Sequence, residues 1–179
     1  MSETHIRALT RAEVDRVWLI DRSEVIEAVY RMKGTDLIRV PEHYNMSGWP
    51  RGEAGEYGPI LLDCFDRGGT FFGVFDSSER LVAVSVLETR FIGPAKDELQ
   101  LTFLHVDRAY RGQGLASRLF AMSVDRAREL GARKLYISAT PSQNTVDYYL
   151  NRGCQLAEEV DPDLFEREPE DIHLEYVIP

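Results

Sequence analysis

Cysteine and histidine are scarce in this chain of 179 residues, and neither residue type clusters. The two cysteines, Cys64 and Cys154, stand far apart, and the four histidines are equally scattered. A disulfide framework needs several paired cysteines, and a structural zinc site needs closely spaced Cys or His ligands. We therefore expect no metal, and we interpret both thiols as reduced and structural, which indicates a cytoplasmic protein.

Long apolar runs are also missing. No stretch approaches the ~20 apolar residues that a membrane-spanning helix requires. The first five residues contain no basic segment followed by an apolar run, as a signal peptide would. Because the sequence shows no repeat, no low-complexity segment and no linker, we expect a single domain over residues 1–179 and no membrane partner.

Basic residues are outnumbered: 21 Lys and Arg stand against 30 Asp and Glu, which gives a formal net charge of −9. Proteins whose main partner is nucleic acid need clustered Lys and Arg to contact phosphates, so we expect no nucleic acid. An acidic surface could steer a cationic substrate, such as an amine, toward the protein. It could equally serve only to keep the protein soluble.

The most informative stretch begins as a strand in the middle of the chain. Leu99, Leu101 and Phe103 alternate with polar residues, which is the two-residue period of a half-buried strand. The phase then slips, because Leu104 follows Phe103 directly and Val106 continues on the new phase. One inserted residue is typical of a β-bulge, which leaves backbone N–H and C=O groups unpaired. The alternative is a strand that is buried on both faces.

A glycine-containing turn follows this strand and leads into an amphipathic helix. The turn consists of Arg111, Gly112, Gln113, Gly114, Leu115 and Ala116. Glycines at a helix start remove side chains, so the free N–H groups of the first turn can face a ligand. The helix dipole and the charge of Arg111 add positive potential, which indicates a phosphate or pyrophosphate site. The alternative is a tight strand-to-helix turn without a ligand.

The segments before the central strand alternate between strands, helices and a loop. We predict a strand at 5–8, a helix from residue 11, a hairpin of 25–30 and 36–41, a loop at 43–52, a helix at 53–65, and a hairpin of 70–75 and 81–87. Pro59 is expected near the first turn of its helix, where a missing N–H costs nothing. Tyr44, Met46 and Trp49 on the loop could line a pocket or merely cover the edge of the core.

Beyond the central helix, which Gly131 ends, the sequence predicts a second βα unit. We expect a strand at 134–139, a helix opened by 141–144 and ended by Gly153, a strand at 156–160, an acidic excursion at 161–171 and a last strand from 172. A strand, a long helix and a strand form a right-handed crossover, so the strand at 134–139 should lie parallel to the central strand.

The central strand, turn and helix resemble the acyl coenzyme A binding motif of the GNAT N-acyltransferase superfamily. That motif reads Arg/Gln-x-x-Gly-x-Gly/Ala after a bulged strand, and Arg111, Gly114 and Ala116 fill its three positions. The resemblance covers about the segment 81–153. It implies that the backbone amides of residues 111–116 hold the pyrophosphate of acetyl coenzyme A (acetyl-CoA).

The same resemblance implies how the rest of the coenzyme binds and how the chain folds. The backbone groups of Leu104 and Val106, on either side of His105, would pair with the pantetheine arm like an added strand. The implied fold is α/β: a single GNAT-like domain whose mixed, mostly antiparallel central sheet is splayed at a parallel strand pair, with helices on both faces. An edge strand of such a sheet could also support a homodimer.

Acyl transfer to an amine needs a base for the amine, an N–H donor for the thioester oxygen and an acid for the leaving thiolate. The segment from Tyr148 to Gly153 resembles the Phe/Tyr-Tyr-x-x-x-Gly element of the family, whose Tyr hydroxyl lies near the coenzyme sulfur. Tyr149 is therefore the candidate acid, and the alternative is a core tyrosine. The resemblance names the N–H of Val106, or else that of Leu104, as the donor to the oxygen.

Glu98 is the candidate base, because several members of the family place a catalytic glutamate at the start of the central strand. Asp97, Glu88 and His105 are the alternatives, and a carboxylate at a strand end could also be merely solvated.

Two departures from the family pattern stand near Tyr149. Ser142 occupies a position where Asn is common, and Cys154 occupies one where Phe is usual. If the helix start is shifted by two residues, Asn144 could contact the pantetheine instead.

The sequence therefore predicts an N-acetyltransferase that moves an acetyl group from acetyl-CoA to a primary amine by direct transfer. The alternative is a non-catalytic acyl-CoA sensor, since a fold does not fix a function. An acid and a base beside the thioester would separate the two.

Overall fold

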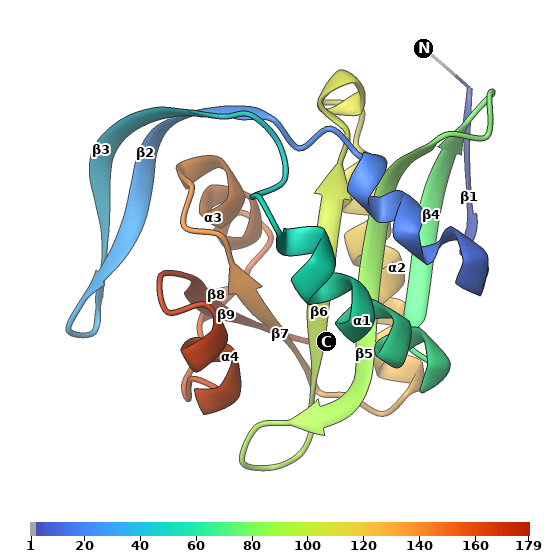
Figure 1. Cartoon of the computed structure of the whole chain (residues 1–179). Helices are drawn as coiled ribbons and strands as arrows, with labels where there is room; N and C mark the ends of the chain where they lie inside the picture. The colour runs from blue at the N-terminus through green and yellow to red at the C-terminus, as the bar shows by residue number, and fades with distance from the viewer. Residues whose placement is uncertain (1–2) are drawn as a thin grey trace.

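The computed structural model describes residues 3–179, which form one α/β domain around a seven-stranded sheet (Figure 1). The sheet has the order β1-β4-β5-β6-β7-β9-β8. Its strands are β1 (Thr4–Ala8), β4 (Thr70–Asp76), β5 (Leu81–Ile92), β6 (Glu98–Val106), β7 (Lys134–Ala139), β8 (Gln155–Leu156) and β9 (Ile172–Val177). A separate hairpin consists of β2 (Glu24–Lys33) and β3 (Asp36–Met46).

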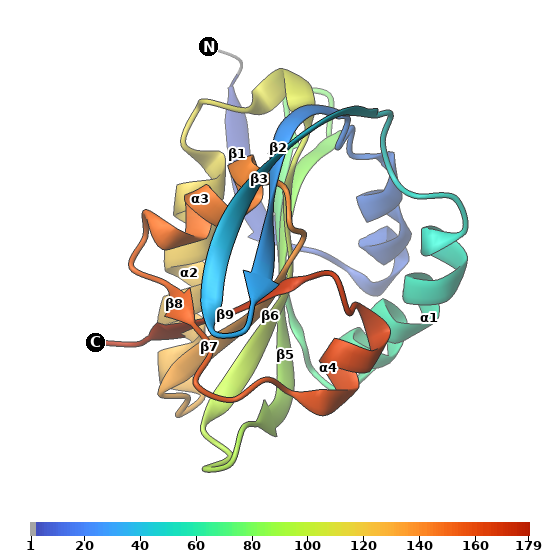
Figure 2. The ribbon, with the colours of Figure 1, turned by 90° about the vertical axis from the view of Figure 1, so that its left-hand side faces the viewer.

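Helices cover both faces of the sheet, as the family resemblance implies. The helical segments are η1 (Arg11–Leu19), α1 (Glu53–Asp66), η2 (Arg108–Tyr110), α2 (Leu115–Glu129), α3 (Gln143–Leu150) and α4 (Pro162–Arg167). Figure 2 shows α2 and α3 on one face and η1, α1 and α4 on the other. Each layer has its own apolar core, and none of the described helices is long and apolar enough to cross a membrane.

The predicted phase slip in β6 is confirmed, one residue earlier than the sequence places it. Phe103 pairs with Val86, but Leu101 already pairs with Leu87, so Thr102 is the extra residue of the bulge. As a result, Leu101 packs under α2 and α3, whereas Phe103, only two positions later, packs under η1 and α1. The bulge therefore turns the following side chains to the opposite faces of the sheet.

The parallel pair β6 and β7 is confirmed, and it separates after only three residues. Glu98, Leu99 and Gln100 pair with residues 134–136 of β7, and no pairing is present between later residues of these two strands among the described residues. The buried pair of Leu99 with its partner Leu135 closes the narrow end. Figure 1 shows the two strands diverging from there, so a wedge opens in the middle of the sheet.

Four local predictions need correction. The hairpin strands are longer than predicted, and β3 includes residues 43–46, which the sequence placed in a loop. Pro59 lies in the second turn of α1 rather than the first, where it removes the N–H that would bond to Gly55. The strand expected at 156–160 is only two residues long, and the expected excursion contains the six-residue helix α4, which is too short to show a helical period.

We expect the layer under α2 to carry much of the stability of the fold. Leu119 of α2 is fully buried, so Leu119→Ala should lower the free energy of unfolding by about 2–5 kcal/mol. Leu19, at the end of η1, is 73% exposed, and Leu19→Ala should cost less than about 0.5 kcal/mol. Urea unfolding measures both, and equal losses would contradict this placement of the core.

Candidate active site

A cavity of about 1030 Å³ runs through the wedge between β6 and β7. Along the wedge, its walls are residues 100–106 of β6 and residues 137–141, which include the end of β7. The turn at the start of α2 and one side of α3 also line it, as do parts of α1, β3 and the segment 164–171. The cavity therefore joins the two faces of the sheet. All predicted coenzyme-binding residues line it except Gln113, which is exposed.

The free edge of β6 offers backbone groups to this cavity. The N–H of Asp107 donates to the carbonyl of Val82 in β5 (2.8 Å), so these two residues form a hydrogen-bonded pair of the antiparallel ladder. Because hydrogen-bonded and non-hydrogen-bonded pairs alternate along an antiparallel ladder, Val106 and Leu104 direct their N–H and C=O groups away from β5. These groups face the wedge, as an edge strand faces an incoming peptide.

The glycine turn presents backbone N–H groups at the wide end of the wedge. Gly112 and Gly114 both have φ of +76°, a conformation that L side chains rarely adopt, and open space lies where a Cβ would stand. The first N–H of α2 bonded to the turn is that of Arg118, which donates to the carbonyl of Gly114 (3.1 Å). The N–H groups of residues 115–117 therefore have no helical acceptor, and the N-terminus of a helix favours an anion.

Arg111 holds this turn in place rather than projecting freely from it. Its guanidinium donates to the backbone carbonyls of Val106 (3.1 Å) and Ser23 (3.0 Å). The turn is thereby fixed to β6 and to the segment before β2. The positive charge of Arg111 therefore stands beside the turn, but its N–H groups are largely used by the protein.

The α3 side of the cavity carries both tyrosines of the family element. Tyr149 is buried in the core shared by α2 and α3, and burial raises the pKa of its hydroxyl, so the group is protonated at neutral pH. The ring of Tyr148 lies edge-on to that of Tyr149 (5.2 Å between centroids), and the guanidinium of Arg152 lies 3.6 Å from the Tyr148 ring centroid. Arg152 also bonds to Ser117 of α2.

The N-terminus of α3 is tied to the hairpin. Ser142 caps the helix by accepting from the N–H of Thr145 (3.4 Å). Asn144 lines the cavity, and its side-chain amide donates to Glu24 of β2 (2.6 Å). The hydroxyl of Tyr30, also on β2, donates to Asp147 of α3 (2.6 Å). The hairpin therefore forms a wall of the site: Glu24 of β2 lines the cavity, as do Tyr44 and Met46 of β3, for which the sequence offered a pocket as one of two alternatives.

Aromatic rings surround His105 on the face of η1 and α1. The ring of Trp49 lies edge-on to His105 (4.8 Å) and also contacts Phe103, and its indole N–H donates to the carbonyl of Ile20 (3.0 Å). Trp49 thus covers the edge of this core and is not part of the described cavity lining, whereas Tyr44 and Met46 do line the cavity. Burial, together with the charges of Arg22 and Arg111, lowers the pKa of His105 to about 3. A lowered pKa makes the His105 ring a weak proton acceptor, which disfavours it as a base.

The same face carries a polar group of residues that the sequence did not single out. Arg22, 9% exposed, pairs with Glu53 at the start of α1 (3.4 Å), and burial raises the pKa of Glu53. Tyr57 of α1 bonds to Glu168, and Ser138 of β7 donates to Asp171 (2.8 Å). Glu168 and Asp171 gave only a weak signal in the sequence, because both stand in the segment 161–171 that the sequence analysis treats as an excursion.

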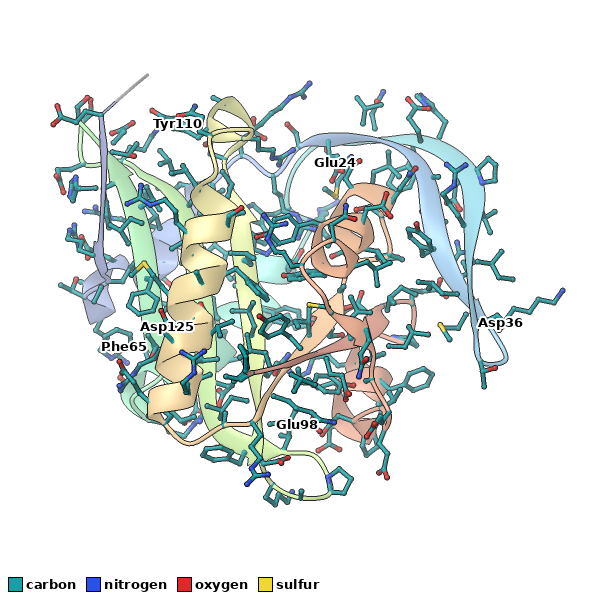
Figure 3. The ribbon with its side chains drawn as sticks, turned by 180° about the vertical axis from the view of Figure 1, so that it is seen from behind. Glu24, Asp36, Phe65, Glu98, Tyr110 and Asp125 are labelled. Atoms are coloured by element: carbon teal, nitrogen blue, oxygen red, sulfur yellow. The ribbon has the colours of Figure 1, made fainter. Side chains whose placement is uncertain are left out.

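The predicted base does not belong to this arrangement. Glu98, Asp97 and Glu88 are all outside the described lining of the cavity. Figure 3 shows Glu98 at the opposite end of β6 from Tyr110, which follows that strand. Burial raises the pKa of Glu98, which faces Lys134. The Glu88 carboxylate is bonded to Arg67 (2.6 Å) and has a pKa of about 2 despite its burial.

The comparison with protein families decides the affiliation of the chain. A model described as the acetyltransferase (GNAT) family matches residues 35–154, which is more than half of the chain. The chain belongs to the GNAT acetyltransferase family. The match extends further toward the N-terminus than the resemblance seen in the sequence. A comparison with curated proteins gave no significant match.

Solved structures of acetyltransferases share the fold over nearly the whole chain. A nourseothricin acetyltransferase is 18% identical with a TM-score of 0.75, covering 98% of this chain and 99% of its own. A Bacillus anthracis protein assigned as a streptothricin acetyltransferase, solved with acetyl-CoA, is 15% identical with a TM-score of 0.72 and 99% coverage of both chains. PaiA N-acetyltransferase from Thermoplasma acidophilum, solved with coenzyme A, is 14% identical with a TM-score of 0.63, covering 98% and 99%.

We expect His105 to stay neutral from pH 8 to pH 5, so its ring C–H resonances should not move in a proton NMR titration. Trp49→Ala should admit water to the ring and raise the His105 pKa toward its ordinary value. Phe165→Ala, which removes a ring near His173 instead, serves as the control. A wild-type titration of His105 near pH 6.5 would show that the ring is solvated, contrary to this account.

Proposed function

We propose that this chain is an N-acetyltransferase that moves an acetyl group from acetyl-CoA to a primary amine by direct transfer. The observation that carries the proposal is the two-sided cavity: a glycine turn and a free strand edge lie along one part of it, and half-buried carboxylates lie in another. Direct transfer needs both substrates in one continuous cavity, so that the amine can reach the thioester.

The residues along the wedge fit acetyl-CoA, which supplies an activated acetyl thioester. The free N–H groups at the start of α2 would hold the pyrophosphate, and the edge groups of Leu104 and Val106 would pair with the pantetheine amides. This assignment places Asn144 beside the pantetheine, although its amide already donates to Glu24. Two of the three acetyltransferases named above were solved with coenzyme A or acetyl-CoA, which supports the same choice.

We assign the acid role to Tyr149. Its raised pKa keeps the hydroxyl protonated at neutral pH, ready to donate to a leaving thiolate. Tyr149 also lines the cavity. The Val106 N–H on the free edge of β6 is the donor for the thioester oxygen in this proposal.

A non-catalytic acyl-CoA sensor is the competing function. A sensor would need the coenzyme-binding turn and edge, but not a buried tyrosine or the carboxylates on the other face of the sheet. The presence of both sets of groups favours the enzyme. Two buried free thiols are consistent with a reducing compartment, so a cytoplasmic location stays our proposal, as does a single domain over residues 1–179. A homodimer stays a prediction.

Binding of acetyl-CoA should raise the midpoint of thermal unfolding, with ADP having little effect. Ligand at about one hundred times its Kd stabilises by roughly 2.7 kcal/mol, which is about 5–10 °C for a domain of this size. Gly114→Ala should remove most of this shift. Gly68→Ala is the matched control, because Gly68 also has a positive φ (+91°) but follows α1, away from the cavity. If millimolar acetyl-CoA does not raise the unfolding midpoint of the wild type, the glycine turn does not bind the coenzyme and the proposal is contradicted.

Tyr149→Phe should lower kcat by about 10²-fold, since the thiolate loses its proton donor, while KM for the amine changes little. Thiol release at saturating substrates measures this. Tyr176→Phe is the control, because Tyr176 packs on the same core but does not line the cavity. Unchanged turnover in Tyr149→Phe would rule out the acid role.

A further inference from the structure

The base of the proposed reaction must lie where the amine arrives. Alternation along β7 sends Leu135, Ile137 and Ala139 to the core under α2 and α3, so Ser138 points to the opposite face. Asp171, immediately before β9, accepts a hydrogen bond from Ser138 (2.8 Å), and both residues line the cavity. Asp171 is thus fixed to the strand that forms one wall of the wedge. Tyr149, by contrast, belongs to the α2 and α3 core.

This division matches the chemistry. The amine attacks the thioester carbon from one side, and the acid must reach the sulfur that departs on another. A proton acceptor on the α1 and α4 face and a proton donor on the α2 and α3 face, both lining the wedge, meet this requirement. The sequence placed the base on β6 itself, where no carboxylate lines the cavity among the described residues.

Resting on the proposed function, we propose that Asp171 is the catalytic base that takes a proton from the incoming ammonium group, with Ser138 as its positioning residue. The neutral amine then forms the C–N bond as the C–S bond breaks. The remaining surplus proton of the amine nitrogen passes to Tyr149, which has given its own proton to the sulfur. The products are the amide, the free thiol and one proton, which Asp171 releases to solvent.

The groups that face Asp171 are mostly acidic or already paired. On α1, Glu53 pairs with Arg22 and Tyr57 bonds to Glu168; Glu170 pairs with Arg31 of the hairpin. Burial is the main cause that raises the pKa of Asp171 to about 6; the Ser138 hydrogen bond and Arg22 oppose it, and Glu168 and Glu53 support it. A carboxylate with this pKa is ionised at pH 7 and yet a better proton acceptor than an ordinary aspartate.

Glu53 is another half-buried carboxylate of this face. It is tied to the Arg22 guanidinium, and it lies on α1, across the cavity from the wall of the wedge. The lowered pKa of His105, caused by burial and by Arg22 and Arg111, disfavours it as the base. Of these two carboxylates, Asp171 is the one that is hydrogen-bonded to β7, a wall of the wedge, and that forms no ion pair with a described residue.

The test compares two nearly isosteric acceptors, ethylamine and 2,2,2-trifluoroethylamine, with acetyl-CoA. Ethylamine is cationic at neutral pH and must lose a proton, whereas the fluorinated amine is already mostly neutral. Asp171→Asn should lower kcat by about 10²–10³-fold with ethylamine. The loss with trifluoroethylamine should be less than tenfold. Glu166→Gln, an exposed change on α4 that lies outside the cavity, is the matched control.

The pH dependence gives a second readout. Since only ionised Asp171 accepts a proton, wild-type kcat with ethylamine should fall as the pH drops through about 6, and Asp171→Asn should lack this limb. Ser138→Ala removes a hydrogen bond that favours the carboxylate, so it should move the limb to higher pH. A carbon-13 NMR titration of the Asp171 carboxyl, without any substrate, should show the same upward shift.

The outcomes separate the two proposals. Wild-type protein that releases no thiol above the rate of hydrolysis with either amine would overturn the proposed function, and the role of Asp171 with it. Active wild-type protein with equal losses for both amines in Asp171→Asn, or with an unchanged low-pH limb, would overturn only the role of Asp171. A selective loss with ethylamine, together with the NMR shift in Ser138→Ala, would support it.

Discussion

The separation of β6 from β7 is the constraint on which the rest of the structure depends. The two strands pair through only three residues, and their backbone groups beyond Gln100 face each other across a wedge in the middle of the sheet. Leaving a buried backbone group unpaired costs about 1–3 kcal/mol, so this edge must meet water or a ligand. A strand-like ligand of suitable length would satisfy it, and this edge is the place that we propose for the extended, amide-containing pantetheine arm.

Neighbouring features keep the wedge open and divide it. The pair of Leu99 with Leu135 closes the narrow end with two fully buried side chains. The bulge at Thr102 then turns Phe103 toward η1 and α1, where it builds an aromatic wall with Trp49. One inserted residue thus decides which side chains reach each face of the sheet. The chemistry that we propose depends on this division.

Local signals were sufficient for much of this arrangement. The slipped period of β6 predicted a bulge to within one residue, and the glycines predicted a turn with free N–H groups, because both depend on neighbours in the chain. The family element around Tyr149 likewise placed that side chain at the cavity. The sequence could not show that Arg111 bonds to the carbonyl of Ser23, since that contact joins distant segments.

The base illustrates the limit most clearly. Glu98 lies at the start of β6, the strand that lines the cavity. The cavity begins only at Gln100, so Glu98 lies outside the lining. Asp171 stood in an acidic segment without a period, and only the pairing of β7 with β9 brings it to Ser138. Residues that act together across a sheet are set by topology, which the local pattern does not encode.

Amide hydrogen exchange of β6 tests the central claim most directly. If the wedge binds the pantetheine arm along the free edge, acetyl-CoA should slow the exchange of the Leu104 and Val106 amides. The amides of Phe103 and His105, already directed toward β5, should change much less. Equal protection of all four amides, or protection confined to the turn at 111–116, would contradict an edge-paired coenzyme and with it the account of the wedge.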